Sequence, residues 1–393
     1  MFQKVCKRLC EKEIKSIAHW IGFNNTTLQY VNHAAVEING YIYSFGGYNG
    51  TNTLSKIQIE VHILITELLI WKRIEYKSKW SDDDIPLQCY GHTVVAYKNN
   101  AYIWGGNEIM NDNIYCFNTD DFSWSCLKTR GKIPPSRDGH TACVTDDYMY
   151  ICGGFLKNLS SEFLEVYQLN FITLEWEYLY IKNNVPYWKD FHSAVFIDKK
   201  MYLFGGQQLK RKQNICSNEL IYLDTETMTW NYLNPKGNVP QGRRSHSAFV
   251  YRKNMYIFGG YNSIANQFFN DLYLYKPTDN TWELVRTIGK GPSPRRRQSC
   301  CIICDRVVIF GGASPKTPPS ATFSLETNNF IDKYFIYHDD IFMLNLFLPL
   351  KTLSIIKIIN ENIDISKLPE LLRKEIFKYC KNQHECTSYP LFQ

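Results

Sequence analysis

The sequence has 393 residues, of which 45% are hydrophobic and 15% aromatic, so it has enough apolar material for a large core. It carries 44 Lys and Arg against 38 Asp and Glu, a formal net charge of +6. This modest excess excludes the dense basic stripe of a nucleic-acid-binding protein, and we expect no direct nucleic-acid contact. The many aromatic side chains favour β-strands, whose half-buried surfaces accommodate them well.

The N-terminal segment and the cysteines indicate a reducing compartment. The first 20 residues hold seven charged side chains and no apolar run of signal-peptide length. The most apolar segment, near 344–359, is interrupted by Lys351 and Lys357, so no membrane contact is expected. We therefore expect the cytoplasm, the nucleus or both, with free thiols. Cys301-x-x-Cys304 has the spacing of half a zinc site, but it lies in an apolar strand pattern without a second pair. Buried thiols are expected there, and no metal or other cofactor.

A diglycine follows an apolar segment six times, and this repeat organises the chain. The first glycines of successive pairs are 59, 48, 52, 54 and 52 residues apart, close to the period of about 50 residues of one class of propeller blade. The pairs are Gly46-Gly47, Gly105-Gly106, Gly153-Gly154, Gly205-Gly206, Gly259-Gly260 and Gly311-Gly312. Thirteen residues before each first glycine stand His33, His92, His140, His192, His246 and Gln298.

The segments before the diglycines are continuously apolar, which is typical of strands covered on both faces. In chain order they are Tyr41–Phe45, Ala101–Trp104, Met149–Cys152, Met201–Phe204, Met255–Phe258 and Val307–Phe310. A tryptophan follows each of the first five diglycines, but none follows the sixth. Trp20 lies 13 residues before His33, where a closing strand of the last blade is expected. The N-terminal segment would then seal the ring and remove its open sheet edges.

These observations predict an all-β fold, a six-bladed β-propeller with a short C-terminal helical segment. The expected division is an extension over 1–16, the propeller over 17–347, helices over 348–380 and a tail over 381–393. The repeated histidines allow two interpretations, as metal or catalytic ligands or as structural groups. Their recurrence at one position in five blades favours a structural hydrogen bond between neighbouring blades.

The spacings, together with segments such as RDGHTACV, KDFHSAVF, MYIFGGYN and PRRRQSCCII, resemble the kelch repeat family. The resemblance runs from about Trp20 to Ile376. Within that family the chain is similar to substrate receptors of cullin-2 ubiquitin ligases, which are not themselves catalytic. Such receptors recognise the free C-terminus of a client protein, commonly one that ends in glycine. The resemblance implies elongin B/C and cullin-2 as partners, and C-terminal peptides of clients as ligands.

A carboxylate site needs preorganised donors, and a guanidinium group offers a bidentate fork. Three residues before each histidine position the blades carry Tyr30, Cys89, Arg137, Lys189, Arg243 and Arg295. A basic residue there is ordinary for such blades. Arg244, Arg296 and Arg297 are additional, and they lie on consecutive blades whose equivalent loops emerge on one face. They are candidate ligands of a peptide carboxylate; a solvated basic surface is the alternative.

Two acids and a glutamine complete the predicted ligand site. Asp138 and Asp190 share the position of Arg244 and Arg296, so they are candidates for holding a basic penultimate side chain; pairing with Arg137 or Lys189 is the alternative. The resemblance places an arginine directly after the fourth diglycine, as a clamp on the carboxylate. This chain has Gln207, which donates only a neutral hydrogen bond, and Arg211 is a candidate to compensate.

The region after the propeller resembles two docking motifs. Leu350, Ser354 and Ile358 are four residues apart, a helical spacing, and resemble an elongin-binding box with serine where the family usually has cysteine. A second pattern resembles a cullin-2 box and consists of Leu368, Pro369, Leu372 and Ile376. Its proline is well placed at a helix start. The alternative is an amphipathic helical cap on the propeller.

Three classes of function remain open, because a fold does not determine a function. The first is a substrate receptor for client degradation. The second is a kelch scaffold that binds actin, chromatin or another protein without ligase activity. The third is an enzyme like the copper-radical propeller oxidases, which would need convergent Tyr, His and Cys ligands outside the repeated positions.

Overall fold

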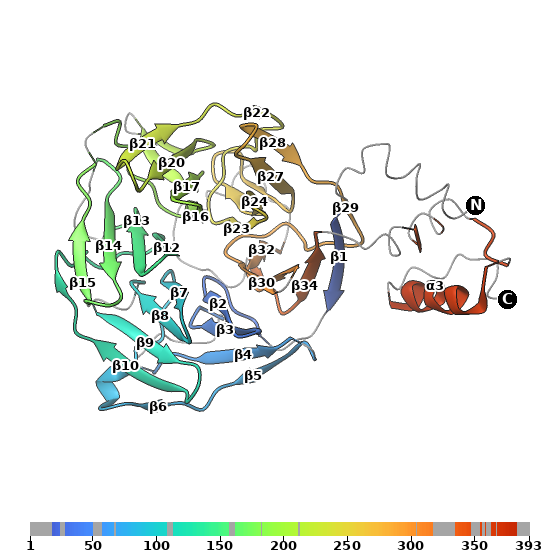
Figure 1. The fold of residues 1–393 in the computed structure, drawn as a ribbon, viewed down its shortest axis with the longest axis horizontal. Helices are drawn as coiled ribbons and strands as arrows, with labels where there is room; N and C mark the ends of the chain where they lie inside the picture. Colours follow the sequence, from blue (N-terminus) through green and yellow to red (C-terminus); the bar gives the residue numbers. More distant parts are fainter. Residues whose placement is uncertain are drawn as a thin grey trace.

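In the computed structural model the chain forms six β-sheets arranged around a central axis, a six-bladed β-propeller (Figure 1). The structure describes residues 18–23, 28–49, 57–66, 68–107, 113–156, 162–181, 183–210, 213–303, 305–316, 335–346, 354–355, 358, 363–366 and 368–382. No helix within these ranges is long and apolar enough to cross a membrane. The predicted fold class is confirmed.

Each blade has four antiparallel strands, named below in order from the axis outward. Blade one holds β2 (Ala34–Ile38), β3 (Tyr41–Phe45), β4 (Val61–Ile65) and β5 (Ile70–Arg73). Blade two holds β7 (Thr93–Tyr97), β8 (Asn100–Trp104), β9 (Ile114–Asn118) and β10 (Ser123–Leu127). Blade three holds β12 (Thr141–Thr145), β13 (Tyr148–Cys152), β14 (Val166–Asn170) and β15 (Glu175–Tyr178). Blade four holds β16 (Ser193–Ile197), β17 (Lys200–Phe204), β20 (Leu220–Asp224) and β21 (Thr229–Tyr232). Blade five holds β23 (Ser247–Tyr251), β24 (Asn254–Phe258), β27 (Leu272–Lys276) and β28 (Thr281–Leu284). Blade six holds β30 (Ser299–Ile303), β31 (Arg306–Phe310), β34 (Ile341–Asn345) and β1 (Ala18–Phe23).

Shorter elements decorate this ring. Two-residue strands from the linkers pair in parallel with the outer strands of blades two, three, five and six: β6 (Lys77–Ser78), β11 (Arg130–Gly131), β22 (Lys236–Gly237) and β29 (Thr287–Ile288). Small antiparallel strand pairs follow the diglycines of blades four to six: β18 (Gln207–Lys210) with β19 (Gln213–Cys216), β25 (Tyr261–Asn262) with β26 (Gln267–Phe268), and β32 (Ala313–Pro315) with β33 (Phe335–Tyr337). Among the described residues, the other named elements are a 3-10 turn, η1 (Asp82–Asp84), and the helix α3 (Glu370–Asn382).

The N-terminal strand lies in the last blade. β1 pairs antiparallel with β34, with Trp20 opposite Leu344, so residues from the two ends of the propeller share one sheet (Figure 1). Trp20 is 3% exposed, and its ring lies 5.4 Å from that of Phe258 and 6.3 Å from that of Phe342. Trp20 therefore occupies the outer-strand position that tryptophans occupy in the other five blades.

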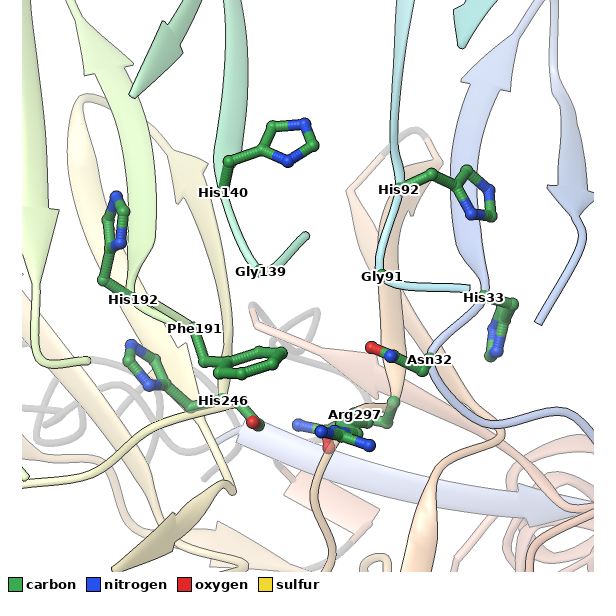
Figure 2. A pocket seen from close by; sticks show the side chains of 12 residues that line it. Asn32, His33, Gly91, His92, Gly139, His140, Phe191, His192, His246 and Arg297 are labelled. Carbon is green, nitrogen blue, oxygen red and sulfur yellow. The ribbon is translucent and has the colours of Figure 1, made fainter. Parts of the chain in front are cut away.

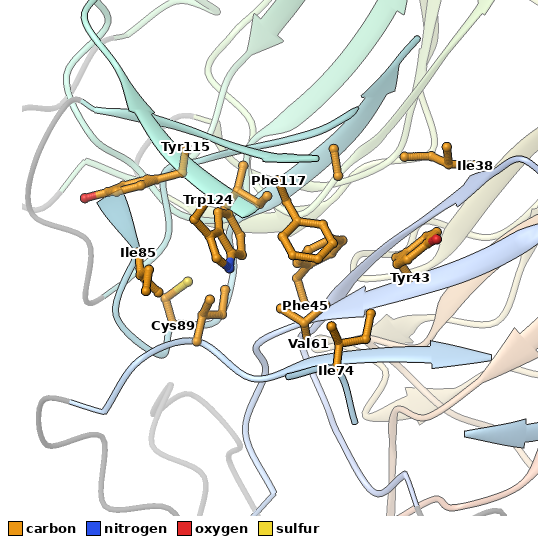
Figure 3. Close-up of a cluster of buried hydrophobic side chains, with 13 residues drawn as sticks. Ile38, Tyr43, Phe45, Val61, Ile74, Ile85, Cys89, Tyr115, Phe117 and Trp124 are labelled. Atoms are coloured by element: carbon orange, nitrogen blue, oxygen red, sulfur yellow. The ribbon is translucent and has the colours of Figure 1, made fainter. Parts of the chain in front are cut away.

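The core is divided into apolar clusters between neighbouring blades. Figure 3 shows the one between blades one and two, where Phe45, Phe117 and Trp124 meet with ring centroids 5.0–5.9 Å apart. Comparable clusters lie at each of the other blade contacts. Because the blades stack through both faces, the second strand of each blade is buried at its last four positions in a row instead of at alternate ones.

The diglycines join each blade to the next. All twelve glycines have positive φ, which L side chains rarely adopt. A Cβ on Gly153 would lie 2.6 Å from the carbonyl oxygen of Lys189 in the next blade, so no side chain fits there. The N–H of Gly154 donates to that same oxygen over 2.9 Å, and the equivalent bond recurs at every blade contact, including Gly312 to Tyr30.

The repeated histidines also bridge blades. The Nε2 atom of His140 lies 2.7 Å from Thr93 Oγ1, and that of His192 lies 3.0 Å from Thr141 Oγ1. The Nε2 atom of His246 lies 2.7 Å from Ser193 Oγ. The expected structural hydrogen bond is confirmed for these three histidines. Burial lowers the pKa of His192 to about 3 and that of His92 to about 4, so both are neutral at physiological pH. Gln298 bridges differently, since its Nε2 donates to the carbonyl of Phe258 in the preceding blade over 3.0 Å.

Candidate functional site

A closed ring of backbone hydrogen bonds surrounds the propeller axis. Its members are the residues just before the histidine positions: Asn32, Gly91, Gly139, Phe191, Ser245 and Arg297. The N–H of each donates to the carbonyl oxygen of its counterpart in the preceding blade, over 2.7–3.2 Å. The bond from Asn32 to Arg297 joins the first blade to the sixth and completes the ring.

All six ring residues have a left-handed backbone, with φ between 50° and 71°. Glycine adopts this conformation readily and asparagine tolerates it, whereas other residues pay roughly 1–2 kcal/mol. Two blades carry glycine at this position, while Phe191 and Arg297 accept the strain. Such outliers cluster at functional sites, so their side chains point to a role beyond folding.

The ring side chains line a hollow of about 140 Å³ on the axis (Figure 2). Figure 2 shows the Phe191 ring, Asn32 and Arg297 pointing into it, with the histidines around its wall. Buried Asn32 Nδ2 and Ser245 Oγ have no hydrogen-bond partner among the described residues. Polar groups that are buried without partners are unfavourable, and a polar ligand would satisfy them.

Of the three predicted arginines, Arg297 lines this hollow, and Arg244 and Arg296 lie near Arg297 without lining it. Arg244, Arg296 and Arg297 are at most 9% exposed, and each lies close enough for its charge to affect another's titration. Neither Arg244 nor Arg296 forms an ion pair with any carboxylate in the described part of the chain. Nε of each is buried and lacks an acceptor there.

Aromatic rings support the guanidinium groups. The guanidinium carbon of Arg296 lies 5.1 Å from the ring centroid of Tyr261 and 5.2 Å from that of Phe335. Phe191 carries two of them, with Arg244 at 5.8 Å and Arg297 at 5.0 Å. Cation–π contacts of this kind hold a guanidinium plane in position while its N–H donors remain available.

The electrostatics of this cluster favour an anion. Burial, together with the neighbouring arginine charges, lowers the pKa of Arg296 well below its ordinary value. Burial and Arg244 lower the pKa of Arg297 to about 10. Arginine side chains keep their charge in proteins, so the described structure holds three buried like charges in proximity. A carboxylate between them would relieve the repulsion.

The predicted acids lie close enough to the arginines for their charges to interact, Asp190 with Arg244 and both acids with Arg297. Asp190 is 4% exposed, and its Oδ1 has no hydrogen-bond partner among the described residues. Burial raises its pKa to about 7 against the opposing effect of Arg244, with a further rise from Asp138. Arg137 and Lys189, the alternative partners of these acids, form ion pairs with other residues. Arg137 pairs with Glu165 at 3.0 Å and Lys189 with Glu219 at 2.8 Å.

The basic residues three positions before the histidines are structural. Besides the two pairs above, Arg243 binds Asp271 and Arg295 binds Asp340, each with a closest contact of 2.5 Å. Each of these acids directly precedes the third strand of the same blade. Tyr30 replaces the arginine in blade one and donates its hydroxyl hydrogen to Glu60 in the same place. These groups are paired, unlike Arg244 and Arg296.

Gln207 lies beside Asp190. Its backbone pairs with that of Asp190 in both directions, over 2.9 and 3.0 Å. The other residue predicted to assist there, Arg211, lies outside the described residues. No group of three or more His, Cys, Asp or Glu within the described ranges could hold a metal ion. Cys301 is buried, which raises the pKa of its thiol to about 12; Cys304 is not among the described residues.

The C-terminal candidate residues fall partly in one small apolar cluster. Ile376 on α3 is buried against Ile355 and Ile365, with Ile358 and Leu368 packed beside them. Ser354 and Leu372 are half-buried and Pro369 is exposed, while Leu350 lies outside the described residues. Three of the predicted docking side chains, Ile358, Leu368 and Ile376, therefore pack within the chain itself.

Three residues that line the hollow were not predicted from the sequence: Asn32, Phe191 and Ser245. A signal for them exists in the repeat, because the position before the histidine is glycine in blades two and three. Glycine or asparagine recurring at one position indicates a left-handed backbone near a tight approach.

Comparison with known proteins places these features in context. Residues 32–154 and 91–312 match the model of the KLHDC2/KLHL20/DRC7 Kelch-repeats domain. Kelch domain-containing protein 3 of Bos taurus is 37% identical over 358 residues, which cover 88% of this chain and 92% of that protein. The Homo sapiens protein of the same name is 36% identical over the same shares. Host cell factor 2 of Homo sapiens is 27% identical over 63% of this chain and 33% of its own length.

Proposed function

Because this chain belongs to the family of KLHDC2/KLHL20/DRC7 kelch-repeat proteins, we propose that it is a non-catalytic substrate receptor of a cullin-2 ubiquitin ligase. In this role its propeller mouth binds the free C-terminus of client proteins, especially those that end in glycine. A protein-binding role suits the kelch propeller itself. The ligase and the client terminus are what the proposal adds.

One observation carries the ligand assignment: Arg244 and Arg296 are buried, charged and without a carboxylate partner among the described residues. A chain terminus supplies the one carboxylate that every protein has, and it can enter a recess that side chains on a surface cannot reach. Two guanidinium groups can each bind such a carboxylate bidentately. Asn32 Nδ2 and Ser245 Oγ add neutral donors at the same opening.

The acidic side supports a preference for a basic penultimate residue. Asp190 and Asp138 lie near the arginines, and both acids influence the titration of Arg297. A terminal carboxylate on the arginines would bring the preceding side chain toward these acids. A lysine or arginine there would complement their charge. Gln207, bonded to the backbone of Asp190, lies beside this part of the site rather than in the arginine cluster.

The ligase assignment depends on the segment after the propeller. Leu350, Ser354 and Ile358 would bind elongin B/C, and Leu368, Pro369, Leu372 and Ile376 would bind cullin-2. The packing of Ile358, Leu368 and Ile376 in one cluster also fits a second candidate function, a kelch scaffold whose C-terminal segment is only a helical cap. The two candidates differ in their partners.

Affinity purification separates them. The tagged chain should retain elongins B and C and cullin-2 from cell extract, and Leu350→Asp should lose them, because an unpaired charge in an apolar groove is unfavourable. Leu284→Asp, at a 50% exposed position on β28, is the matched control and should retain them. If the unaltered chain retains no elongin, the receptor assignment fails and the scaffold assignment replaces it.

The ligand assignment is tested with a random peptide library displayed with free C-termini. Selection on the purified chain should enrich glycine at the last position and lysine or arginine before it. Enrichment of internal motifs, with no preference at the terminus, would contradict binding at the mouth.

A further inference from the structure

We infer that Phe191 is the residue that reads the last residue of the bound chain: it admits glycine, excludes larger side chains, and positions Arg244 and Arg297 for the carboxylate. The inference rests on the proposed function, which it refines. It starts from the ring of six left-handed residues around the axis.

The backbone at this position needs no side chain. Gly91 and Gly139 form the same ring hydrogen bonds as Phe191, with similar φ values of 71° and 64° against 50°. Glycine would satisfy the ring in blade four with less strain, because a bulky residue with positive φ is an outlier. The phenyl group is therefore present for what it contacts.

The ring of Phe191 is directed across the mouth toward blade three. A Cβ built on Gly139 would lie 3.0–3.1 Å from three of its ring atoms, so the phenyl group covers that glycine. Figure 2 shows it pointing into the hollow, between Gly139 and Arg297. It thus fills part of the space that a ligand entering along the axis would need.

The same ring contacts two arginines of the proposed ligand site. Arg244 and Arg297 lie over it at 5.8 and 5.0 Å, and Asp190 directly precedes it in the chain. A carboxylate bound by these two arginines would have its Cα next to the phenyl group. A hydrogen atom on that carbon fits beside the ring, whereas a branched side chain would meet it.

Phe191 thus selects by exclusion, and the arginines select by attraction. Specificity of this kind commonly combines an attractive and a repulsive element. A few carbon atoms in or against a packed pocket change binding by about tenfold or more. We expect a difference in affinity of this size between peptides ending in glycine and peptides ending in valine.

The test compares free-acid peptides that share one library-selected sequence and end in Gly, Ala, Val or Leu, each with its amidated form. The unaltered chain should prefer Gly to Val by about tenfold or more. Phe191→Gly should bind the four within about threefold of one another. Phe191→Leu, which keeps a bulky group but no ring, should lose much of the preference for free acid over amide, since its arginines are no longer held by the ring.

Leu174→Gly is the matched control. Leu174 also has a positive φ, 55°, but lies in a turn between β14 and β15 of blade three, so this variant relieves similar strain without touching the mouth. It should keep the ranking and the acid preference. Thermal melting of every variant identifies those that fold. If Phe191→Gly does not fold, the ratio of free-acid to amide affinity in Phe191→Leu decides whether the inference holds.

The outcomes are distinct. A ranking of Gly over Val that survives in folded Phe191→Gly, or a preference for free acid over amide that is unchanged in Phe191→Leu, overturns this inference and leaves carboxylate recognition standing. An unaltered chain that binds Gly-ended and Val-ended acids equally has the same consequence. If the unaltered chain binds no free acid better than its amide, the proposed function fails, and this inference fails with it.

Discussion

The backbone N–H of Asn32 donates to the carbonyl oxygen of Arg297 over 3.2 Å, and this bond closes the axial ring between the first and the sixth blade. Ring closure at the axis and strand closure at the rim thus use different parts of the chain. At the rim, β1 supplies the outer strand of blade six. Arg297 takes part in the closure and is also a candidate residue of the ligand site.

Rim closure can be tested through Trp20. Trp20→Ala should lower the free energy of unfolding by about 3–5 kcal/mol, because it removes a large buried ring packed on Phe258 and Phe342. Trp80→Ala, at a position 69% exposed, should change it by less than about 1 kcal/mol. Chemical denaturation monitored by circular dichroism measures both. Equal stability of the two variants would mean that β1 does not hold the ring.

Truncation gives a second test of the same closure. Removing residues 1–16 should leave a folded protein, whereas removing residues 1–30 deletes β1 and should destabilise it severely. Thermal melting of the two truncated chains measures the difference. The same melting temperature for both would show that the ring closes without β1.

The buried histidines predict acid sensitivity. His192 is neutral in the folded chain because burial lowers its pKa to about 3, whereas the unfolded chain binds a proton near its ordinary pKa of 6.5. The contribution of neutral His192 to the free energy of unfolding is therefore fully present above pH 6.5 and is lost as the pH falls toward 3. His192→Gln, which introduces the residue that blade six carries at Gln298, should reduce the loss between pH 6.5 and 5 by about 2 kcal/mol.

The control for that variant is Thr141→Val, which removes the hydroxyl group 3.0 Å from His192 Nε2 but keeps the imidazole. It should lower stability at every pH without changing the slope. Urea denaturation across the pH series measures the slopes. An unchanged slope in His192→Gln would contradict the assignment of this histidine to the acid response.

Asp190 predicts the opposite trend. Burial raises its pKa to about 7, so the unfolded chain releases this proton at a lower pH than the folded chain does. Its contribution to stability is present below about pH 4 and is lost as the pH rises through 7. Asp190→Asn should therefore be more stable than the unaltered chain at pH 8, by roughly 2–4 kcal/mol, and no more stable at pH 4. The exposed Asp279→Asn should show no such difference.

The charge of Asp190 should also govern the penultimate residue of the ligand. Peptides with penultimate lysine should bind better than those with alanine at pH 8, and this advantage should shrink at pH 6 as Asp190 becomes protonated. Asp190→Asn should remove the pH dependence of the advantage. Calorimetric titration at the two pH values measures it. The same lysine advantage in both proteins at both pH values would assign that preference to other residues.

The sequence predicted the fold through its repeat, because diglycines and histidines that recur at fixed spacing are needed at every blade contact. It also brought Arg244, Arg296 and Arg297 to one mouth, since equivalent loops emerge on one face. The axial ring was not predicted, because a left-handed backbone at Phe191 or Arg297 leaves no sign in the residue type. The partners of Arg137 and Lys189 were not predicted either, since Glu165 and Glu219 lie just before the third strand of each blade, far along the chain.

Binding of a terminal carboxylate by the unpaired arginines of the mouth is the central claim. The most direct measurement is calorimetric titration of one library-selected peptide, as free acid and as amide, against the unaltered chain, Arg244→Ala and the control Arg252→Ala, whose side chain is exposed. The free acid should bind the unaltered chain and Arg252→Ala at least roughly tenfold more tightly than the amide, because a charge-assisted hydrogen bond contributes about 1.5–3 kcal/mol. Arg244→Ala should bring the acid close to the amide. Equal binding of acid and amide to the unaltered chain would contradict the claim and leave the arginines as a buried basic cluster without this ligand.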